Sequence, residues 1–335
     1  LGATGAGSGA LGGGRRVSSD RLVHDPDAVA ALSVTVAERT GVPADHIEKD
    51  FWVTEVLRGV VTAAHHLGVE VVFKGGTSLS KAFSLIERFS EDVDVLVVLS
   101  PQDSTGARDR TLRDLVAGAA DATTLEPVSV PGATSKGAKR GARFHYRPEA
   151  TASVGGLTAG VFLELGSRGG ALPATPLPVS SLLALHAADQ IAGAPEAEPV
   201  LVRVLAPWRT LVEKLVLLHT AHTAADPDAA IRGARHYYDV RQLLTRPEIL
   251  AGIHEHGIGI LARDVCTYSR AADMPAADRP SDGFATSPAF NDGPHVAASR
   301  VEYEERVLPV LLWPGPNAPT FDECVAAVHD RADHL

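Results

Sequence analysis

The stretch VEVVFKGGTSLSKAFSLIERFSEDVDVLVVL, residues 69–99, decides the fold of this chain. Residues 69–73 are mostly apolar and predict a short buried strand, which two glycines end. An apolar helix face follows at the spacing i, i+3, i+4, i+7, formed by Leu79, Ala82, Phe83 and Ile86. Residues 92–99 predict a second strand, acidic at its start and apolar afterwards. The expected order is therefore strand, glycine turn, helix, strand.

Two acidic residues, Asp92 and Asp94, stand at the start of the second predicted strand. Because strand side chains alternate, this i, i+2 spacing puts both carboxylates on one face, while Val93 and Val95 point into the core. Two converging carboxylates form a hard oxygen site suited to Mg²⁺ or Mn²⁺. A D-x-D pair alone is equally compatible with an ordinary solvated strand start.

The glycine turn before this helix favours the functional interpretation. Gly75 and Gly76 allow close approach of the backbone to a ligand. Thr77 and Ser78 place amides and hydroxyls at the start of the helix, where anions bind. Thr77 also suits simple helix capping, which is compatible with phosphate binding. A P-loop is excluded because the sequence lacks G-x-x-x-x-G-K-[ST], and Lys81 comes instead five residues after Gly76.

Composition and charge bound the class of protein. The chain has 335 residues, of which 45% are hydrophobic, and a formal net charge of −10. These values exclude a wholly disordered chain and argue against a protein that coats nucleic acid non-specifically. No apolar run approaches the ~18 residues that a membrane span needs. No signal-peptide pattern is visible, and two cysteines form neither a disulfide framework nor a four-cysteine zinc site, so a cytoplasmic protein is expected.

Several separate motifs carry a resemblance to a known family. They are EKDFWVTEVLR (48–58), KGGTSLSK (74–81), IERFSEDVDV (86–95), VFLELGSR (161–168), EKLVLLH (213–219) and RHYYDV (235–240). The order strand, G-G-T-S, helix, D-x-D strand resembles the DNA polymerase β-like nucleotidyltransferase fold. The full set, from about residue 46 to 245, is similar to the AbiEii/AbiGii toxin family. The resemblance implies a toxin with a cognate antitoxin protein, in some members a phage-defence system, that transfers a nucleotide from an NTP to the acceptor end of tRNA.

The resemblance also implies an α+β fold with a mixed sheet, followed by a mainly helical C-terminal domain. We expect a flexible tail at 1–22, the nucleotidyltransferase domain at 23–175 and the helical domain at 176–335, with a loop at 272–296. Helices are expected at 27–39, 46–66, 107–119, 180–192, 207–223, 229–245, 299–311 and 320–331. Further strands are expected at 124–130, 141–147 and 157–165.

The matched acids imply a metal-assisted site. Asp92, Asp94 and Glu164 are the implied ligands of two Mg²⁺ or Mn²⁺ ions that bridge the triphosphate and the attacking hydroxyl. Glu164 would complete the metal site or take the proton of that hydroxyl. Its ordinary alternative is a partly exposed strand residue.

The implied nucleotide contacts come from both domains. They are Gly75, Gly76, Thr77, Ser78, Lys81 and Lys214. Asp239 is implied to orient Lys214 or the nucleotide, and both are counted as catalytic. From spacing alone, Lys214 is equally a solvated lysine, and Asp239 is equally an i, i+4 partner of Arg235 in a pair worth a few tenths of a kcal/mol.

A local basic run contrasts with the acidic chain. It contains Lys136, Lys139, Arg140, Arg143 and Arg147, interleaved with aromatic residues. Such a run fits the backbone of an RNA acceptor, with stacking from an aromatic side chain, or else a solvated hairpin. Ser90 precedes the acidic pair closely, so a phosphate there would repel the triphosphate, which makes Ser90 a candidate regulatory position.

The favoured function is an Mg-dependent toxin that transfers NMP to RNA. Three alternatives stay open: transfer to a protein hydroxyl or a small molecule, a non-catalytic nucleotide-binding regulator, and transfer of the γ-phosphoryl group. Asp92→Ala or Asp94→Ala should abolish transfer in a folded protein, and Lys214→Ala should chiefly weaken nucleotide use.

Overall fold

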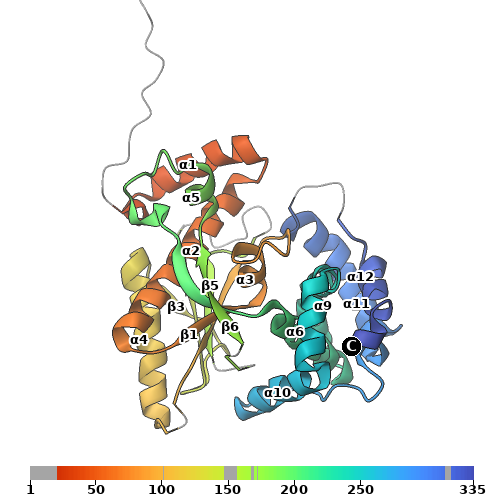
Figure 1. Cartoon of the computed structure of the whole chain (residues 1–335). Helices are drawn as coiled ribbons and strands as arrows, with labels where there is room; N and C mark the ends of the chain where they lie inside the picture. Colours follow the sequence, from red (N-terminus) through yellow and green to blue (C-terminus); the bar gives the residue numbers. More distant parts are fainter. Residues whose placement is uncertain (1–20, 101, 147–156, 167–169, 172, 314–317) are drawn as a thin grey trace, which may run out of the picture.

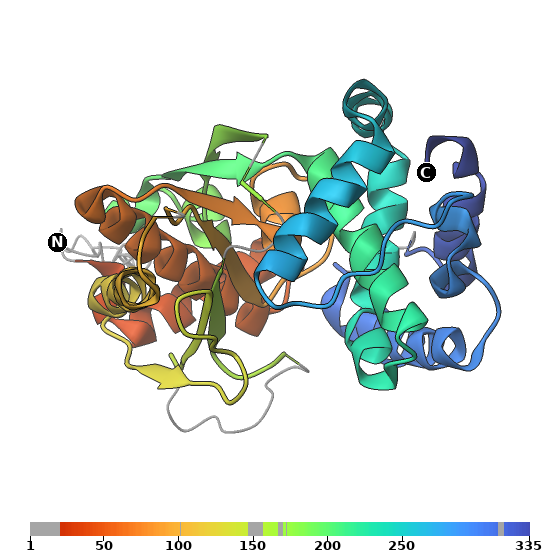
Figure 2. The ribbon, with the colours of Figure 1, turned by 90° about the horizontal axis from the view of Figure 1, so that it is seen from below.

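The computed structural model describes residues 21–100, 102–146, 157–166, 170–171, 173–313 and 318–335. These residues form two halves side by side, a sheet with helices and a bundle of helices (Figure 1, Figure 2). One apolar core runs from Leu22 to Val204, and a second is built mainly from residues 211–335. Leu79, Ile86 and Leu157 of the sheet half belong to the second core, so the two halves are packed together.

A seven-stranded mixed sheet lies at the centre of the first half, in the order β3-β4-β5-β2-β1-β7-β6. Its strands are β1 (Val71–Lys74), β2 (Asp92–Val97), β3 (Pro127–Ser129), β4 (Lys139–Phe144), β5 (Val161–Gly166), β6 (Ala174–Val179) and β7 (Val200–Leu205). β2 runs parallel to β5 and antiparallel to β1, and β1 runs parallel to β7. Because β2 is paired on both sides, the direction of each of its side chains is fixed.

Helices cover one face of this sheet. α2 (Ala44–Leu67) and α4 (Thr105–Thr123) contact the strands, and α1 (Pro26–Thr40) and α5 (Leu182–His186) pack against α2. The short turns η1 (Leu22–His24) and η2 (Pro195–Ala197) belong to the same half, and α3 (Gly75–Lys81) joins β1 to β2, with its Leu79 in the second core. Gly59 allows α2 and α4 to pack closely, since a Cβ atom at this position would lie only 2.7 Å from Ala119 Cα. The side chains of Val93, Val95 and Val97 belong to the same core as those of α2 and α4. The opposite face of β2 is therefore left for Asp92 and Asp94.

The second half is helical. It contains α6 (Pro207–Thr223), α7 (Pro227–Arg232), α8 (Arg235–Leu244), α9 (Pro247–His256), α10 (Ile258–Ala271), α11 (Pro294–Glu302) and α12 (Phe321–His329), with η3 (Phe284–Thr286), η4 (Pro288–Phe290), the π-helical η5 (Tyr303–Leu311) and η6 (Ala332–His334). An aromatic cluster stabilises its core, in which the rings of Tyr237 and Phe321 lie 4.6 Å apart. α6 follows β7 after a single residue, Ala206, so this helix is attached directly to the sheet.

The expected fold class, α+β with a mixed sheet and a mainly helical C-terminal part, is confirmed. The expected boundary at residues 175 and 176 lies two strands too early, because β6 and β7 continue the sheet and the change to helices comes at Ala206. β6 is an edge strand, where the prolines at 176 and 178 are tolerated, and these prolines concealed it in the sequence. Only α5 forms within the helix expected at 180–192.

Other differences are local. Helix α3 ends at Lys81, short of the apolar face expected to reach Ile86, because the chain turns at Ser84 with φ of 53°. The expected helix at 229–245 is two helices, α7 and α8, while α9 and α10 were not expected. The expected loop at 272–296 buries Phe284 and Phe290. The expected tail at 1–22 lies outside the described residues except for Arg21 and Leu22, and Leu22 is fully buried.

None of the helices in the described ranges combines the length and apolarity that crossing a bilayer requires.

Candidate active site

Three acidic side chains project from neighbouring strands onto one face of the sheet. In the register of β2 with β5, Asp92 lies opposite Phe162 and Asp94 lies opposite Glu164. Val93 and Val95 between them are buried in the core on the other face. Because side chains alternate along a strand, Asp92, Asp94 and Glu164 share the face turned away from α2.

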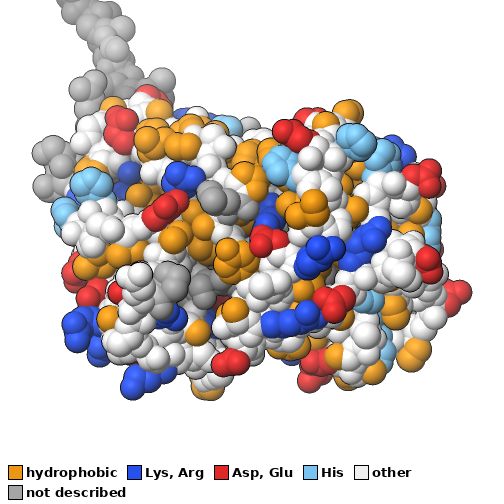
Figure 3. Space-filling view, turned by 60° about the horizontal axis from the view of Figure 1, so that its bottom comes forward, with side chains coloured by type: hydrophobic (Ala, Val, Ile, Leu, Met, Phe, Trp, Pro, Cys, Tyr) orange, Lys and Arg blue, Asp and Glu red, His pale blue; other side chains and the backbone are white. Residues whose placement is uncertain are grey.

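A cleft of about 260 Å³ opens over this face, between the sheet and the helices α6, α8 and α10. The sheet half contributes the three carboxylates together with Gly75 and Gly76, and the helical half contributes Lys214 and Arg235, which carry positive charge. Figure 3 shows acidic and basic side chains next to one another along the line where the two halves meet. The cleft thus collects opposite charges from distant parts of the sequence.

Two of the three carboxylates have a cationic partner. Arg235 Nη2 lies 3.5 Å from Asp92 Oδ2, and Lys139 Nζ lies 2.8 Å from Glu164 Oε2. Asp94, between them, has no such direct partner among the described residues. Burial, followed by the negative charges of Glu164 and Asp92, raises the pKa of Asp94 from 3.8 to about 7. The cleft is therefore short of positive charge at Asp94.

The three carboxylates have the right chemistry to bind a divalent metal, but in this structure they are not arranged as a metal site. Carboxylate oxygens are the ligands that Mg²⁺ and Mn²⁺ prefer, and the raised pKa of Asp94 marks a site where added positive charge would be stabilising. Within the described residues, however, no group of three or more His, Cys, Asp or Glu side chains is gathered closely enough to hold a metal ion. Arg235 and Lys139 would have to release their carboxylates for Asp92, Asp94 and Glu164 to act together.

The two glycines let the backbone approach the charged groups closely. Gly75 has φ of +77°, and a Cβ atom there would lie 2.3 Å from Asp94 Oδ2. A Cβ atom at Gly76 would lie 2.3 Å from Arg88 Nη2. Thr77 and Ser78 are buried behind the glycines, where Thr77 donates a hydrogen bond to the carbonyl of Asp92 and Ser78 to that of Gly75. Their hydroxyls therefore stabilise the turn, and Gly75 and Gly76 themselves line the cleft.

A buried charge cluster stands behind the cleft. Asp239 is fully buried and accepts two hydrogen bonds from Arg88, at 2.6 Å from Nε and 2.8 Å from Nη2. Lys214 Nζ lies 2.7 Å from the same carboxylate and 3.2 Å from Nδ1 of His236. Burial alone would raise the pKa of Asp239, but Arg88 and Lys214 outweigh it and hold the pKa well below its usual range. Burial, followed by the Lys214 charge, lowers the pKa of His236 to about 3, which favours the neutral ring.

This cluster fixes Lys214 in the wall of the cleft. The side chain of Lys214 is 4% exposed, so it is not the solvated lysine of the alternative interpretation. Asp239 pairs with Arg88 and Lys214 rather than with Arg235 four residues earlier, as a helix-surface pair would require. A second cation–acid pair, Lys74 Nζ with Glu213 Oε2 at 2.9 Å, lies in the same wall.

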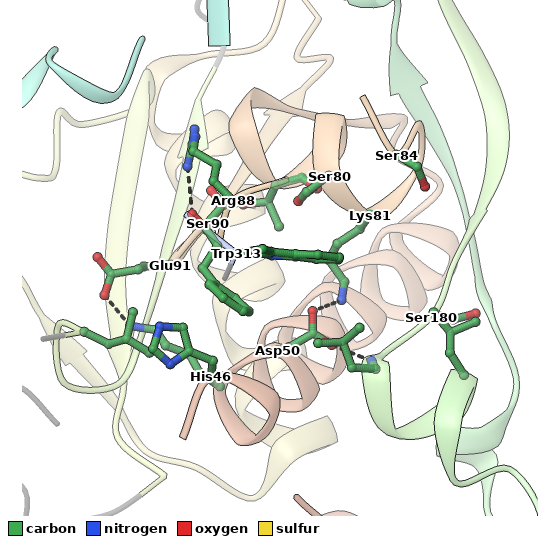
Figure 4. Close-up of a pocket in the computed structure, with 16 residues that line it drawn as sticks. His46, Asp50, Ser80, Lys81, Ser84, Arg88, Ser90, Glu91, Ser180 and Trp313 are labelled. Carbon is green, nitrogen blue, oxygen red and sulfur yellow. Dashed lines mark hydrogen bonds and ion pairs between the residues drawn. The ribbon is translucent and has the colours of Figure 1, made fainter. Parts of the chain in front are cut away.

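Lys81 lies outside the cleft, in a neighbouring cavity of about 110 Å³ (Figure 4). It forms an ion pair with Asp50, which also accepts a hydrogen bond from the backbone amide of Leu182 at 2.6 Å. Ser90 and Arg88 line both the cleft and this cavity. Ser90 thus lies beside the expected triphosphate position, whereas Lys81 is turned away from it.

The basic run divides between the two faces of the sheet. Lys139 and Arg143 lie on the face of Glu164, and the Arg143 guanidinium stands 5.3 Å from the centre of the Phe162 ring, which lines the cleft. Arg140 points to the other face, where Nη2 lies 3.0 Å from Asp109 of α4. Lys136 is exposed in the turn before β4, and Arg147 lies outside the described residues.

Sequence reasoning missed four charged residues of the cleft, namely Lys74, Arg88, Glu213 and Arg235. Each lies inside or beside a motif that the sequence analysis quoted, which is the signal that marks them. Arg88 is the most informative, because its partner Asp239 is 151 positions away in the chain. No local spacing reveals such a contact.

Comparisons with known proteins place these features in a family. Residues 57–326 match the family model described as "Nucleotidyl transferase AbiEii toxin, Type IV TA system". Among solved structures, the chain is similar to MenT4, a nucleotidyltransferase toxin from Mycobacterium tuberculosis H37Rv, at 14% identity, with 92% of this chain and 96% of that chain covered and a TM-score of 0.37. The curated proteins contain no match.

Proposed function

This chain belongs to the AbiEii nucleotidyltransferase toxin family, and we propose that it transfers NMP from a metal-bound NTP to an RNA acceptor, the 3′ end of tRNA. The family establishes a nucleotidyltransferase, a toxin of a type IV toxin–antitoxin system, and therefore a cognate antitoxin as partner. The choice of Mg²⁺, of RNA and of the tRNA end is our proposal.

One arrangement carries the proposal. Asp92, Asp94 and Glu164 share one sheet face, and they line a single cleft together with the Gly75–Gly76 turn and Lys214. A triphosphate is rich in negative charge, so carboxylates beside it are unfavourable unless divalent cations lie between them. The three carboxylates would hold Mg²⁺ there, and the bound metal would supply charge neutralisation for the phosphoryl oxygens.

The protein groups then have distinct tasks. The amides of Gly75 and Gly76 and the ammonium of Lys214 would hold the phosphates, with Asp239 keeping Lys214 in place. The acceptor 3′ oxygen forms a bond to the α-phosphorus while the bond from that phosphorus to the bridging oxygen breaks, and pyrophosphate leaves. The proton of the attacking hydroxyl passes to Glu164, whose side chain is 32% exposed. Positioning and charge stabilisation supply the rate.

The acceptor side is supported by the basic residues beside Glu164. Lys139 and Arg143 share its sheet face, and Lys136 is exposed nearby, so these three would contact RNA phosphates. Arg140 is committed to Asp109 on the other face and is a weaker candidate. A phosphate on Ser90 would lie beside the triphosphate and repel it. We therefore propose that phosphorylation of Ser90 would inhibit the enzyme.

The test uses NTPs labelled at either the α- or the γ-phosphate, with purified tRNA, total protein lysate and small hydroxyl compounds as separate acceptors. We expect label from the α-position alone to appear on tRNA, one NTP being preferred, and EDTA to abolish transfer. Asp92→Ala and Asp94→Ala should fold and be inactive, and Lys214→Ala should chiefly raise the KM for NTP. Transfer of γ-label, label on protein, or full activity of Asp94→Ala would each overturn the proposal.

A further inference from the structure

The cavity beside the cleft has the dimensions of a small-ligand site. Its volume is about 110 Å³, well below the ~300 Å³ at which pockets for drug-sized ligands begin, so it suits one ring system. α2, α3, the start of α5 and the segment 84–91 form its walls, and Trp313 closes it from the helical half. Arg88 and Ser90 of this segment line both the cavity and the cleft, so the two spaces are neighbours.

An aromatic surface is held in this cavity. Figure 4 shows the Trp313 ring edge-on, lying across the cavity between Ser90 and Lys81. The backbone amide of Trp313 donates to the carbonyl of Glu87 at 3.0 Å, and the amide of Phe89 donates to the carbonyl of Leu311 at 2.7 Å. These bonds join the backbones of the two segments, and the centre of the Trp313 ring lies 5.8 Å from that of the Phe89 ring. Trp313 remains 38% exposed, so part of this large aromatic side chain is open to contact with a ligand.

The charged groups of the cavity are already neutralised. Lys49 Nζ lies 2.8 Å from Glu91, and Lys81 pairs with Asp50. Arg88 is paired with Asp239. A charged ligand would have to break a buried pair, so a neutral ligand is favoured.

Hydroxyl groups are the remaining polar groups. Ser84, Ser90 and Ser180 line the cavity, and their side chains make no hydrogen bond within the described part of the chain. A hydroxyl both donates and accepts, so it can pair with either kind of group on the edge of a heterocycle.

We propose that this cavity receives one nucleobase of the acceptor RNA, stacked on Trp313 and contacted at its edge by the serine hydroxyls. The inference rests on the proposed function, in which the acceptor is RNA. A flat, neutral ring with hydrogen-bonding edges fits the walls, and aromatic stacking is the usual way in which proteins hold single-stranded bases.

The backbone beside the cavity connects it to the basic residues of the cleft. Lys49 Nζ donates to the carbonyl of Thr158 at 2.6 Å, and Glu91 accepts from the amide of Thr158. On the next residue, the carbonyl of Ala159 accepts from Arg143 at 3.0 Å. An RNA phosphate at Arg143 and a base in the cavity therefore lie along one continuous wall.

Binding of short RNA tests this site without any catalytic step. The probes are fluorescein-labelled single-stranded RNA pentamers, rA5, rC5 and rU5, measured by fluorescence anisotropy with the full chain. We expect Trp313→Ala to weaken pentamer binding about tenfold or more, as stacking of one base predicts. Trp313→Phe should retain most of the affinity, because it keeps an aromatic face. Val301→Ala, which removes an apolar side chain 51% exposed on α11, is the matched control and should bind normally.

Two further measurements separate the possible explanations. Binding of Mg·ATP by calorimetry should be unchanged in Trp313→Ala, and cooperative thermal unfolding should verify that the variant is folded. Normal pentamer binding by folded Trp313→Ala would overturn the inference. An equal loss of Mg·ATP binding would also overturn it, because the cavity would then hold the base of the NTP. If no acceptor takes label but Trp313→Ala still loses pentamer binding, the proposed transfer fails while the base site stands.

Discussion

The guanidinium of Arg235 lies 3.5 Å from the carboxylate of Asp92, so a cation of the helical half neutralises an acid of the sheet half across the cleft. Arg235 is 40% exposed, whereas Arg88 and Lys214 are held on the buried Asp239. Arg235 is therefore the cleft cation that can leave its partner at least cost. A metal on Asp92 would repel it, and the triphosphate would attract it.

Arg235→Ala should accordingly have opposite effects on two ligands. Mn²⁺ alone should bind about two- to fivefold more tightly, because a competing partly exposed ion pair worth roughly 0–1 kcal/mol is removed. Metal-bound NTP should bind more weakly, because the released guanidinium no longer contacts the phosphates. Mn²⁺ binding is measured by electron paramagnetic resonance and NTP binding by calorimetry. Arg232→Ala, an exposed arginine at the end of α7, should change neither, and a parallel change of both affinities in Arg235→Ala would contradict this account.

Asp94 should make the metal-free protein less stable as the pH rises. Its pKa is raised from 3.8 to about 7 in the folded state, by burial and then by Glu164 and Asp92. Below about pH 4 the carboxyl is protonated in both states, whereas between pH 4 and 7 only the unfolded state releases the proton, which favours unfolding. In EDTA, the Tm of Asp94→Asn minus that of the native chain should therefore increase from pH 4 to pH 8.

Calorimetry with a matched variant checks this expectation. Asp114→Asn, which removes an exposed acid on α4, is the control for the loss of a surface carboxylate. Mg²⁺ at pH 8 should stabilise the native chain more than Asp94→Asn, because the variant lacks one of the proposed metal ligands. A difference for Asp94→Asn that stays constant across pH would show that burial does not disfavour its charge.

Loss of the Asp239 charge should destabilise the fold as well as the site. Asp239→Asn leaves Arg88 and Lys214 buried without their counter-charge, and breaking such a pair costs about 3–5 kcal/mol in the free energy of unfolding. Adding Lys214→Met should recover part of that loss, because one of the two unpaired cations is removed. Urea unfolding of both single variants and the double variant measures the coupling. Strictly additive losses would mean that the three side chains do not act as a unit.

Gly75 and Gly41 provide a matched pair of backbone positions. Both have positive φ, +77° and +75°, but only Gly75 has a neighbour that a Cβ atom would overlap, Asp94 Oδ2 at 2.3 Å. Gly41→Ala should cost about 1–2 kcal/mol of stability and leave NTP binding intact. Gly75→Ala should cost more and lose NTP binding. The double variant Gly75→Ala/Asp94→Ala should regain stability without regaining binding, and equal losses for Gly41→Ala and Gly75→Ala would refute the close-approach argument.

Local patterns predicted the sheet face of the site because they depend on neighbouring residues. Strand alternation alone places Asp92 and Asp94 on one side, and the glycine pair marks the close approach. The same kind of reasoning failed for β6, whose prolines are tolerated only because the strand lies at the sheet edge. Whether a strand is central or at an edge is a property of the whole sheet.

Ion pairs between distant residues are a second feature that sequence spacing does not predict. The i, i+4 spacing suggests Arg235 as the partner of Asp239, yet a helix-surface pair contributes only a few tenths of a kcal/mol. Burial of Asp239 demands stronger compensation, and Arg88 provides it with two hydrogen bonds from the other half of the chain. Lys81 likewise pairs with Asp50 of α2, which lies 31 positions earlier in the chain. Such partners follow from tertiary packing, which spacing does not encode.

Main-chain hydrogen bonds join Leu311 and Trp313 to residues 87–89. The segment that leads into the acidic strand β2 is therefore held by residues near the C-terminal end of the chain. A premature stop shortly before Leu311 would keep every residue that lines the cleft, yet it would remove these main-chain bonds together with the buried side chains of α12. Growth selections for cells that survive expression of this toxin should therefore recover late nonsense and frameshift alleles alongside missense changes at the acids.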